Sequence, residues 1–298
     1  MDYREVLEIA SSELISLEGH TIDVLTVSRP RDLQGAMELS KIVSKLSPII
    51  GNLIEYAIAR HLNEIKIWPK GCQWIRQDPG FPDTLLKDFP GIEPGIEVKT
   101  WFPLSTEITA RFRDSQTHLA TNHIKVVMVA WMLEEILYGK PKILDIWVGE
   151  ALDVAKARDS HYHNPPYYIV MEPEDTSSRT RNLQQTNCNG FKFQGTKQQL
   201  EQAVQFMDSW GKEGKDYSRD RDYQELLREL MGRFPYRLDT NFAKMDRIVL
   251  PSLESFKASL QKRMYLGRSI QSWTRAINSL DETALFPLIE VSNSHLIN

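Results

Sequence analysis

An aspartate, a glutamate and a lysine lie among the apolar positions of two strand-like segments in GFPDTLLKDFPGIEPGIEVKTW, residues 80–101. Asp83 begins the first segment, and Glu97 and Lys99 lie in the second. A hairpin would place Asp83 beside Glu97, and alternate strand residues share a face, so Glu97 and Lys99 would point the same way. Two carboxylates and an ammonium would then meet at one place. Carboxylate oxygens suit Mg²⁺, which fills its remaining positions with water and phosphate oxygens.

An ammonium beside such a site could orient or help to deprotonate a water molecule, and could neutralise charge that develops on phosphorus. The pattern Glu-x-Lys is unspecific by itself, because it begins at Glu64, Glu97 and Glu213 in this chain. Only Glu97 lies in an alternating apolar segment preceded by a strand-like segment that carries an aspartate. The alternative is an exposed hairpin whose cross-strand ion pair adds little stability.

A helix is expected over about residues 48–63, upstream of the hairpin, to position a further carboxylate. Its apolar residues recur at helical spacing after Ser47-Pro48, a pair typical of an N-cap followed by proline in the first turn. Glu55 lies at the border of this apolar stripe, where its carboxylate could reach inward or stay solvated.

The remaining pattern predicts an α/β fold, with a mixed central β-sheet flanked by helices and with helical additions at both ends. Helices are expected over residues 1–45, 150–157 and 253–265, and over much of the chain after residue 196. Strands are expected at residues 84–86, 95–102, 108–112, 124–133, 143–148 and 167–171.

Pro82-Asp83 with Glu97-Val98-Lys99 resembles the motif of the PD-(D/E)XK nuclease superfamily, whose largest group is the type II restriction endonucleases. GNLIE, residues 51–55, is similar to the helix that supplies a further carboxylate in many members. The pairing of GNLIE with GIEVKT also resembles the branch of the nicking endonuclease MutH, although the spacing from Asp83 to Glu97 is longer here. Asp88 is a rival metal aspartate, but it lies in the expected turn DFPG. The resemblance covers about residues 48–150.

The resemblance implies a restriction-endonuclease-like core and Mg²⁺-dependent hydrolysis of double-stranded DNA at a specific short sequence. One or two Mg²⁺ ions held by Asp83, Glu97 and the Val98 carbonyl would activate water for in-line attack, leaving a 5′-phosphate and a 3′-hydroxyl. Glu55 would contribute through water or a second metal. Type II enzymes commonly read symmetric sites, so a homodimer is expected. A repair or nicking nuclease of the MutH kind and a non-catalytic DNA-binding protein are the alternatives.

Base readout would require a second group of residues. RTRNLQQTNCNGFKFQGTK, residues 179–197, combines basic and amide side chains without an acid. Arginine pairs with guanine and Asn or Gln with adenine in the major groove, although polar surface loops have a similar composition. A second basic stretch, residues 255–280, could contact phosphates or form a solvated helix face. The DNA-binding candidates are Arg179, Arg181, Asn182, Gln184, Gln185, Asn187, Asn189 and Lys192, with Gln116 near the DNA backbone.

The composition, with 41% hydrophobic and 26% charged residues, is that of a soluble globular protein. The net charge of -4 gives no overall attraction to nucleic acid, so DNA binding would depend on local basic segments.

The length favours a single elaborated domain of residues 1–298, with a catalytic core at about 48–200 and a mainly helical part at about 200–298. Cys72 and Cys188 are too few for a disulfide framework or a thiolate zinc site. No membrane span or signal peptide is evident, so a cytoplasmic location is expected.

Overall fold

The centre of the protein is a five-stranded sheet in the order β1-β2-β3-β4-β5. The structure, a computed structural model, describes residues 1–78, 80–112, 114, 119–162, 168–169, 191–193, 196–210 and 243–290, and isolated positions between 221 and 238. Neighbouring strands run antiparallel except β3 and β4, which are parallel, so the sheet is mixed. The strands are β1 (Gln73–Arg76), β2 (Thr84–Lys87), β3 (Gly95–Trp101), β4 (Ile124–Leu133) and β5 (Pro141–Glu150).

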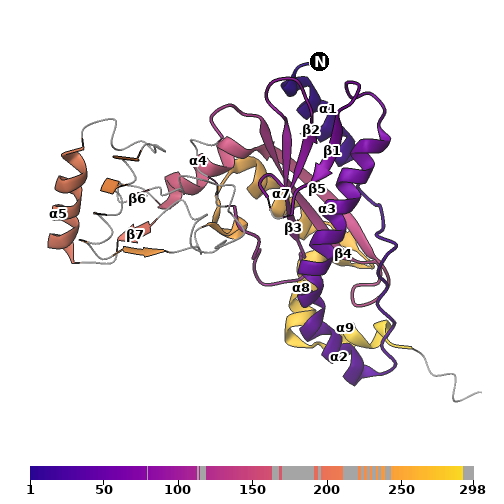
Figure 1. Cartoon of the computed structure of the whole chain (residues 1–298). Coiled ribbons are helices and arrows are strands. Elements are labelled where there is room, and N and C mark those ends of the chain that lie inside the picture. Colours follow the sequence, from indigo (N-terminus) through magenta and orange to yellow (C-terminus); the bar gives the residue numbers. More distant parts are fainter. Residues whose placement is uncertain are drawn as a thin grey trace, which may run out of the picture.

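Helices cover the sheet (Figure 1). On one side, α1 (Tyr3–Ile15) contacts β4 and β5, and α3 (Ser47–Glu64) contacts β1 and β3. On the other side, α4 (Ala151–Tyr162) contacts β4 and β5, and α7 (Pro251–Lys262) contacts β5. The prediction of an α/β protein with a mixed central sheet flanked by helices is therefore confirmed.

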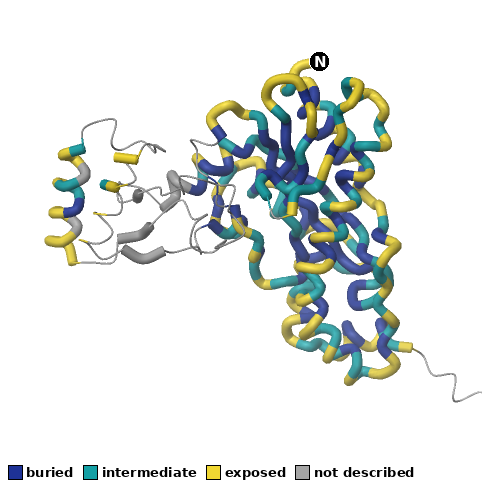
Figure 2. Tube along the Cα trace, viewed as in Figure 1, coloured by how far each residue is buried: buried dark blue, intermediate teal, exposed yellow. Residues whose placement is uncertain are grey.

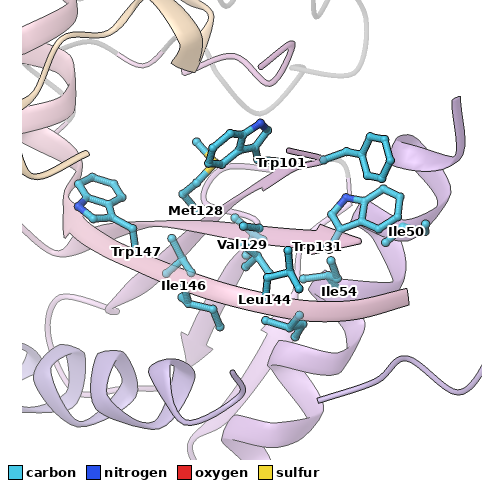
Figure 3. Close-up of a cluster of buried hydrophobic side chains, with 14 of the residues drawn as sticks. Ile50, Ile54, Trp101, Met128, Val129, Trp131, Leu144, Ile146 and Trp147 are labelled. Carbon is cyan, nitrogen blue, oxygen red and sulfur yellow. The ribbon is translucent and has the colours of Figure 1, made fainter. Parts of the chain in front are cut away.

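The strand β4, which lies between the two layers of helices, is at the centre of the hydrophobic core. All ten of its residues are buried, which is the pattern of a strand covered on both faces. Figure 3 shows the side chain of Trp131 near Ile50 and Ile54 of α3, and the rings of Trp131 and Phe102 lie 4.8 Å apart. Figure 2 shows the same distribution along the chain, with the buried segments gathered in the sheet. The core thus fixes α3 against the sheet.

The C-terminal helices pack against the N-terminal part of the chain. Contacts join α2 (Leu33–Ile42) to α8 (Ile270–Ser279) and α9 (Glu282–Leu285). The side chain of Arg29 donates hydrogen bonds to the carbonyl oxygens of Leu288 (3.3 Å) and Pro287 (3.1 Å). The N–H of Glu290 donates to the carbonyl of Pro30 at 2.9 Å. Segments far apart in the sequence therefore close one end of the molecule.

A second, three-stranded sheet in the order β6-β7-β8 lies beyond α4 in Figure 1, apart from the five-stranded sheet. The helix α5 is drawn near it. The elements concerned are β6 (Tyr168–Ile169), β7 (Phe191–Phe193), β8 (Tyr236–Leu238) and α5 (Lys197–Asp208). The remaining short elements are η1 (Val43–Leu46), η5 (Met245–Arg247), β9 (Met264–Tyr265), β10 (Arg268–Ser269) and η6 (Phe286–Leu288).

Several expectations about individual elements need correction. No strand forms over residues 108–112, where only an isolated bridge joins Arg111 to Lys244. Phe112 and Ala110 exchange backbone hydrogen bonds with Ala243 and Met245, and the partner segment turns into the helical turn η5 at Met245. The strand β1 is not among the strands that the sequence predicts. Ser47 is not an N-cap, because α2, η1 and α3 follow one another directly and its backbone is already helical.

Within the described part of the chain, one helical run, Leu33–Glu64, is long and apolar enough to cross a membrane by length and composition alone. Core helices of soluble proteins pass the same test. A third of the apolar window is buried inside the protein, and α3, which forms its second half, packs on β1 and β3. The second half of the run thus contributes Ile50, Ile54, Ile58 and Leu62 to the hydrophobic core.

Candidate active site

The site begins at the pairing of β2 with β3. Thr84 lies opposite Ile96 in an antiparallel register, which brings the preceding residue, Asp83, opposite Glu97. The N–H of Asp83 donates to Oε2 of Glu97 (3.1 Å), and the N–H of Val98 donates to Oδ2 of Asp83 (2.7 Å). The side chains of Asp83 and Glu97 are only 19% and 9% exposed. Two carboxylates are therefore held side by side in a largely buried position.

The ammonium of Lys99 completes this group. It donates to Oε1 of Glu97 and to the carbonyl oxygen of Val98 (3.2 Å), and it lies 3.7 Å from Oδ2 of Asp83. These three residues supply the oxygen atoms that the resemblance assigns to the metal. They surround the ammonium of Lys99, and carboxylate and carbonyl oxygens are also the donors that Mg²⁺ prefers.

Burial and crowding of like charges shift the pKa of Glu97. Burial, together with the nearby carboxylate of Asp83, raises this pKa from its usual 4.5 to about 8, against the opposing effect of Lys99. Burial by itself lowers the pKa of Lys99, but Glu97 and Asp83 outweigh it and raise that pKa above its usual value. Lys99 is therefore charged at neutral pH, while Glu97 gives up its proton only with difficulty.

Asp114 is a further carboxylate that the sequence did not single out. It is 6% exposed, and its charge raises the pKa of both Glu97 and Lys99. Its carbonyl oxygen accepts a hydrogen bond from Nη1 of the buried Arg158 (2.8 Å). Asp114 lies in the connection between β3 and β4, fifteen residues beyond Lys99 in the sequence, without a motif around it. Only the three-dimensional structure places it near the site.

Glu55 lies on α3 and faces the same group. Its Oε2 accepts a hydrogen bond from Nε of Arg76 (2.8 Å), and its side chain is 18% exposed. Burial raises the pKa of Glu55, and the charge of Asp83 raises it further, whereas Arg76 and Lys99 lower it. Arg76 pairs with Thr84, the residue after Asp83, so its partner Glu55 lies beside the hairpin group.

Two glycines let the supporting elements come close. A Cβ on Gly95 would lie 2.2 Å from Cγ of Pro82. Only glycine at this position of β3 therefore leaves room for the ring of Pro82, the residue before Asp83. A Cβ on Gly51 of α3 would lie 3.2 Å from Oγ1 of Thr100, the residue after Lys99. The helix that carries Glu55 and the strand that carries Lys99 are therefore in close contact.

The rival aspartate lies elsewhere. Asp88 follows β2 at a left-handed backbone position (φ 61°), and its N–H donates to Oε1 of Glu93 (2.9 Å). Glu93 also pairs with Lys87 at 3.0 Å. Asp88 is thus part of the exposed turn between β2 and β3, while Asp83 is the aspartate brought next to Glu97.

The residues expected to contact DNA are mostly outside the described part of the chain. For Lys192 the structure gives the backbone, which pairs with Tyr168 and Arg237 in the small sheet. The other candidates lie outside the described residues: Arg179, Arg181, Asn182, Gln184, Gln185, Asn187, Asn189 and Gln116.

The second basic stretch, residues 255–280, makes contacts within the protein. Lys257 pairs with Glu254, and Arg263 pairs with Glu18 at 2.7 Å. Arg268 lies over the ring of Trp273, with its guanidinium carbon 5.3 Å from the ring centroid, and Trp273 is itself buried. Three of the five basic side chains of this stretch thus have partners within the protein, while Lys262 and Arg275 are exposed.

No known protein-family model matches the chain, and no curated protein is significantly similar to it. In the part of the chain that the structure describes, no group of three or more His, Cys, Asp or Glu side chains is close enough to hold a metal ion. The oxygen atoms around Lys99 are instead two carboxylates and one backbone carbonyl, which is a donor set that Mg²⁺ accepts when water and phosphate complete it.

Proposed function

We propose that the protein is a Mg²⁺-dependent endonuclease that cuts double-stranded DNA at a specific short sequence, as a type II restriction endonuclease does, and that it acts as a homodimer. The observation that carries this proposal is the arrangement of Asp83, Glu97 and the Val98 carbonyl around one cationic group, Lys99. An exposed structural hairpin would have no need to bury two carboxylates and an ammonium together, because surface ion pairs add little stability.

Each residue of the site would have its own role in phosphodiester hydrolysis. Asp83, Glu97 and the Val98 carbonyl would hold Mg²⁺, which supplies Lewis acidity to the phosphoryl group and to water. Lys99, freed from these oxygens, would neutralise the negative charge that grows on the phosphorus oxygens in the transition state. Glu55 would orient water from the side of α3. The products would be a 5′-phosphate and a 3′-hydroxyl.

The test is cleavage of a mixture of plasmid and genomic DNAs with Mg²⁺, followed by sequencing of the ends. Wild type should give ends at one short sequence, whereas Asp83→Asn and Lys99→Ala should abolish cleavage and still bind DNA in a fluorescence anisotropy assay. Lys125→Met is the matched control. Lys125 is also buried and pairs with Glu8 (2.8 Å) and Glu150 (2.5 Å), but it lies outside the site. This variant should lose stability and keep its specific cleavage.

The same assay separates the alternatives. Cleavage of one strand only would support a nicking or repair nuclease of the MutH kind. DNA binding by wild type, with intact DNA after incubation of every substrate, would overturn the nuclease proposal in favour of a non-catalytic DNA-binding protein.

A further inference from the structure

Arg76, at the end of β1, is held by an unusual number of partners next to the site. Its Nε donates to Oε2 of Glu55 (2.8 Å), its Nη1 to Oδ2 of Asp78 (2.8 Å) and its Nη2 to Oδ1 of Asn52 (2.5 Å). Its guanidinium carbon also lies 4.7 Å from the centroid of the Tyr56 ring. The side chain is 11% exposed. The planar fork of an arginine can satisfy several acceptors at fixed angles, which the single ammonium of a lysine cannot do.

The partners of Arg76 are themselves fixed. Asn52 donates its amide Nδ2 to the carbonyl of Pro48 one turn earlier in α3 (2.8 Å), so its oxygen is the atom left to face Arg76. Asn52 and Glu55 are three residues apart and lie on one face of the helix. Arg76 therefore holds Glu55 from a rigid position rather than as a loose surface pair.

Docking of α3 on β1 does not explain this arrangement. These two elements are already joined further along by Asn63, whose Nδ2 donates to the carbonyl of Trp74 (2.7 Å) and whose Oδ1 accepts from the N–H of Trp74 (2.9 Å). Trp74 is almost completely buried. Arg76 instead holds Glu55 beside the hairpin, because Arg76 pairs with Thr84 and the N–H of the next residue, Gln77, donates to the carbonyl of Asp83 (2.7 Å).

We propose that Arg76 is a positioning residue that holds Glu55 by Oε2, so that its other oxygen, Oε1, faces the cation site formed by Asp83 and Glu97. This inference rests on the proposed function, because it assumes that the site takes a divalent cation. Residues that orient metal ligands or their neighbours typically change metal affinity by about 10–100-fold when they are replaced.

The experiment measures Mn²⁺ binding to the full chain by isothermal titration calorimetry without DNA. Arg76→Met should weaken Mn²⁺ binding about tenfold or more, and Arg76→Lys should weaken it less, because lysine keeps the charge but not the fork. Glu55→Gln should have an effect similar to that of Arg76→Met. The double variant should bind no more weakly than either single variant, since both changes remove the same interaction.

Asn63→Ala is the matched control, because it removes a contact between the same helix and strand outside the site. It should lower the melting temperature and leave Mn²⁺ affinity unchanged. Mn²⁺ binding by Arg76→Met as tight as that of wild type would overturn the inference. An equal loss of affinity in Asn63→Ala would also overturn it, since the effect would then come from docking of α3.

The inference and the proposed function fail in different ways. If wild type binds Mn²⁺ in an Arg76-dependent manner but cuts no DNA, the proposed nuclease activity is wrong and the role of Arg76 stands. If wild type cuts DNA but Arg76→Met keeps full Mn²⁺ affinity, only the role of Arg76 is wrong. A wild type that takes up no Mn²⁺ at millimolar concentration overturns both.

Discussion

At the scale of single residues, negative charges lie close together at the site. The carboxylates of Asp83 and Asp114 both raise the pKa of Glu97, against the effect of Lys99. Because the surroundings are buried, this repulsion is poorly screened by water, and proton binding at Glu97 relieves it. A bound divalent cation would relieve it more effectively and would give the protein a different response to pH.

The raised pKa of Glu97 predicts a specific dependence of stability on pH. A carboxyl whose pKa is higher in the folded than in the unfolded protein stabilises the fold below its unfolded pKa, and this contribution is lost as pH rises toward the folded value. Without divalent cations, the free energy of unfolding of wild type should therefore fall between about pH 4.5 and about pH 8. Glu97→Gln should reduce this slope. Urea denaturation at several pH values in the presence of a chelator measures both.

Mg²⁺ provides the control for this prediction. At pH 8 it should raise the stability of wild type, because a cation that binds only the folded protein shifts unfolding by mass action, and it should have less effect on Glu97→Gln. Equal pH slopes for wild type and Glu97→Gln would contradict the assignment of the titration to Glu97.

At the scale of elements, the hairpin depends on the close approach of Pro82 to Gly95. Replacing Gly95 by alanine would push its Cβ against the proline ring, which cannot rotate away as a flexible side chain could. We expect Gly95→Ala to lower the free energy of unfolding by about 1–3 kcal/mol, as for other overpacked sites, and to weaken Mn²⁺ binding because Asp83 is displaced. Chemical denaturation and calorimetry would test the two effects.

Gly51→Ala is the comparison for Gly95→Ala. Its Cβ would meet only the side chain of Thr100, with Oγ1 at 3.2 Å and Cγ2 at 3.9 Å, and alanine favours a helix interior by about 1 kcal/mol over glycine. The stability of this variant should therefore stay close to that of wild type. A loss in Gly51→Ala as large as that in Gly95→Ala would show that the proline contact is not the cause.

Local pattern was sufficient to predict the elements that form the centre of the site. Asp83 and Glu97 are only fourteen positions apart, so a local hairpin is enough to bring them together. The alternation of side chains along β3 places Lys99 on the same face as Glu97. The helix around Glu55 follows from its apolar spacing. Arg76 and Asp114 could not be predicted in this way, because their places depend on how β1 and the β3–β4 connection pack in three dimensions. The expected strand at residues 108–112 failed for the same reason.

At the scale of the whole molecule, the two sequence-distant ends of the described chain depend on each other. Arg29 joins them through the carbonyls of Leu288 and Pro287, and its guanidinium carbon lies 5.3 Å from the ring centroid of Tyr138. We expect Arg29→Met to lower the free energy of unfolding by about 1–3 kcal/mol, since hydrogen bonds from charged groups contribute about that much. Hydrogen exchange should then speed up in α2, α8 and α9 together.

Arg4→Met is the control for this variant. Arg4 also lies near a tyrosine ring, that of Tyr3 at 5.5 Å, but its contacts are exposed and local. This change should leave hydrogen exchange in α2, α8 and α9 as in wild type. If Arg29→Met accelerates exchange in α2 alone, the coupling between the chain ends is weaker than the contacts indicate.

The closure of α2 by α8 and α9 also bears on how the protein is made in the cell. Arg29 and Leu288 are 259 positions apart, so α8 and α9 can cover the surface of α2 only after the more than 200 residues between them have been synthesised. Such long-range contacts form slowly. During translation this surface is a natural binding place for chaperones, and a stalled or prematurely terminated chain would be prone to aggregate through it.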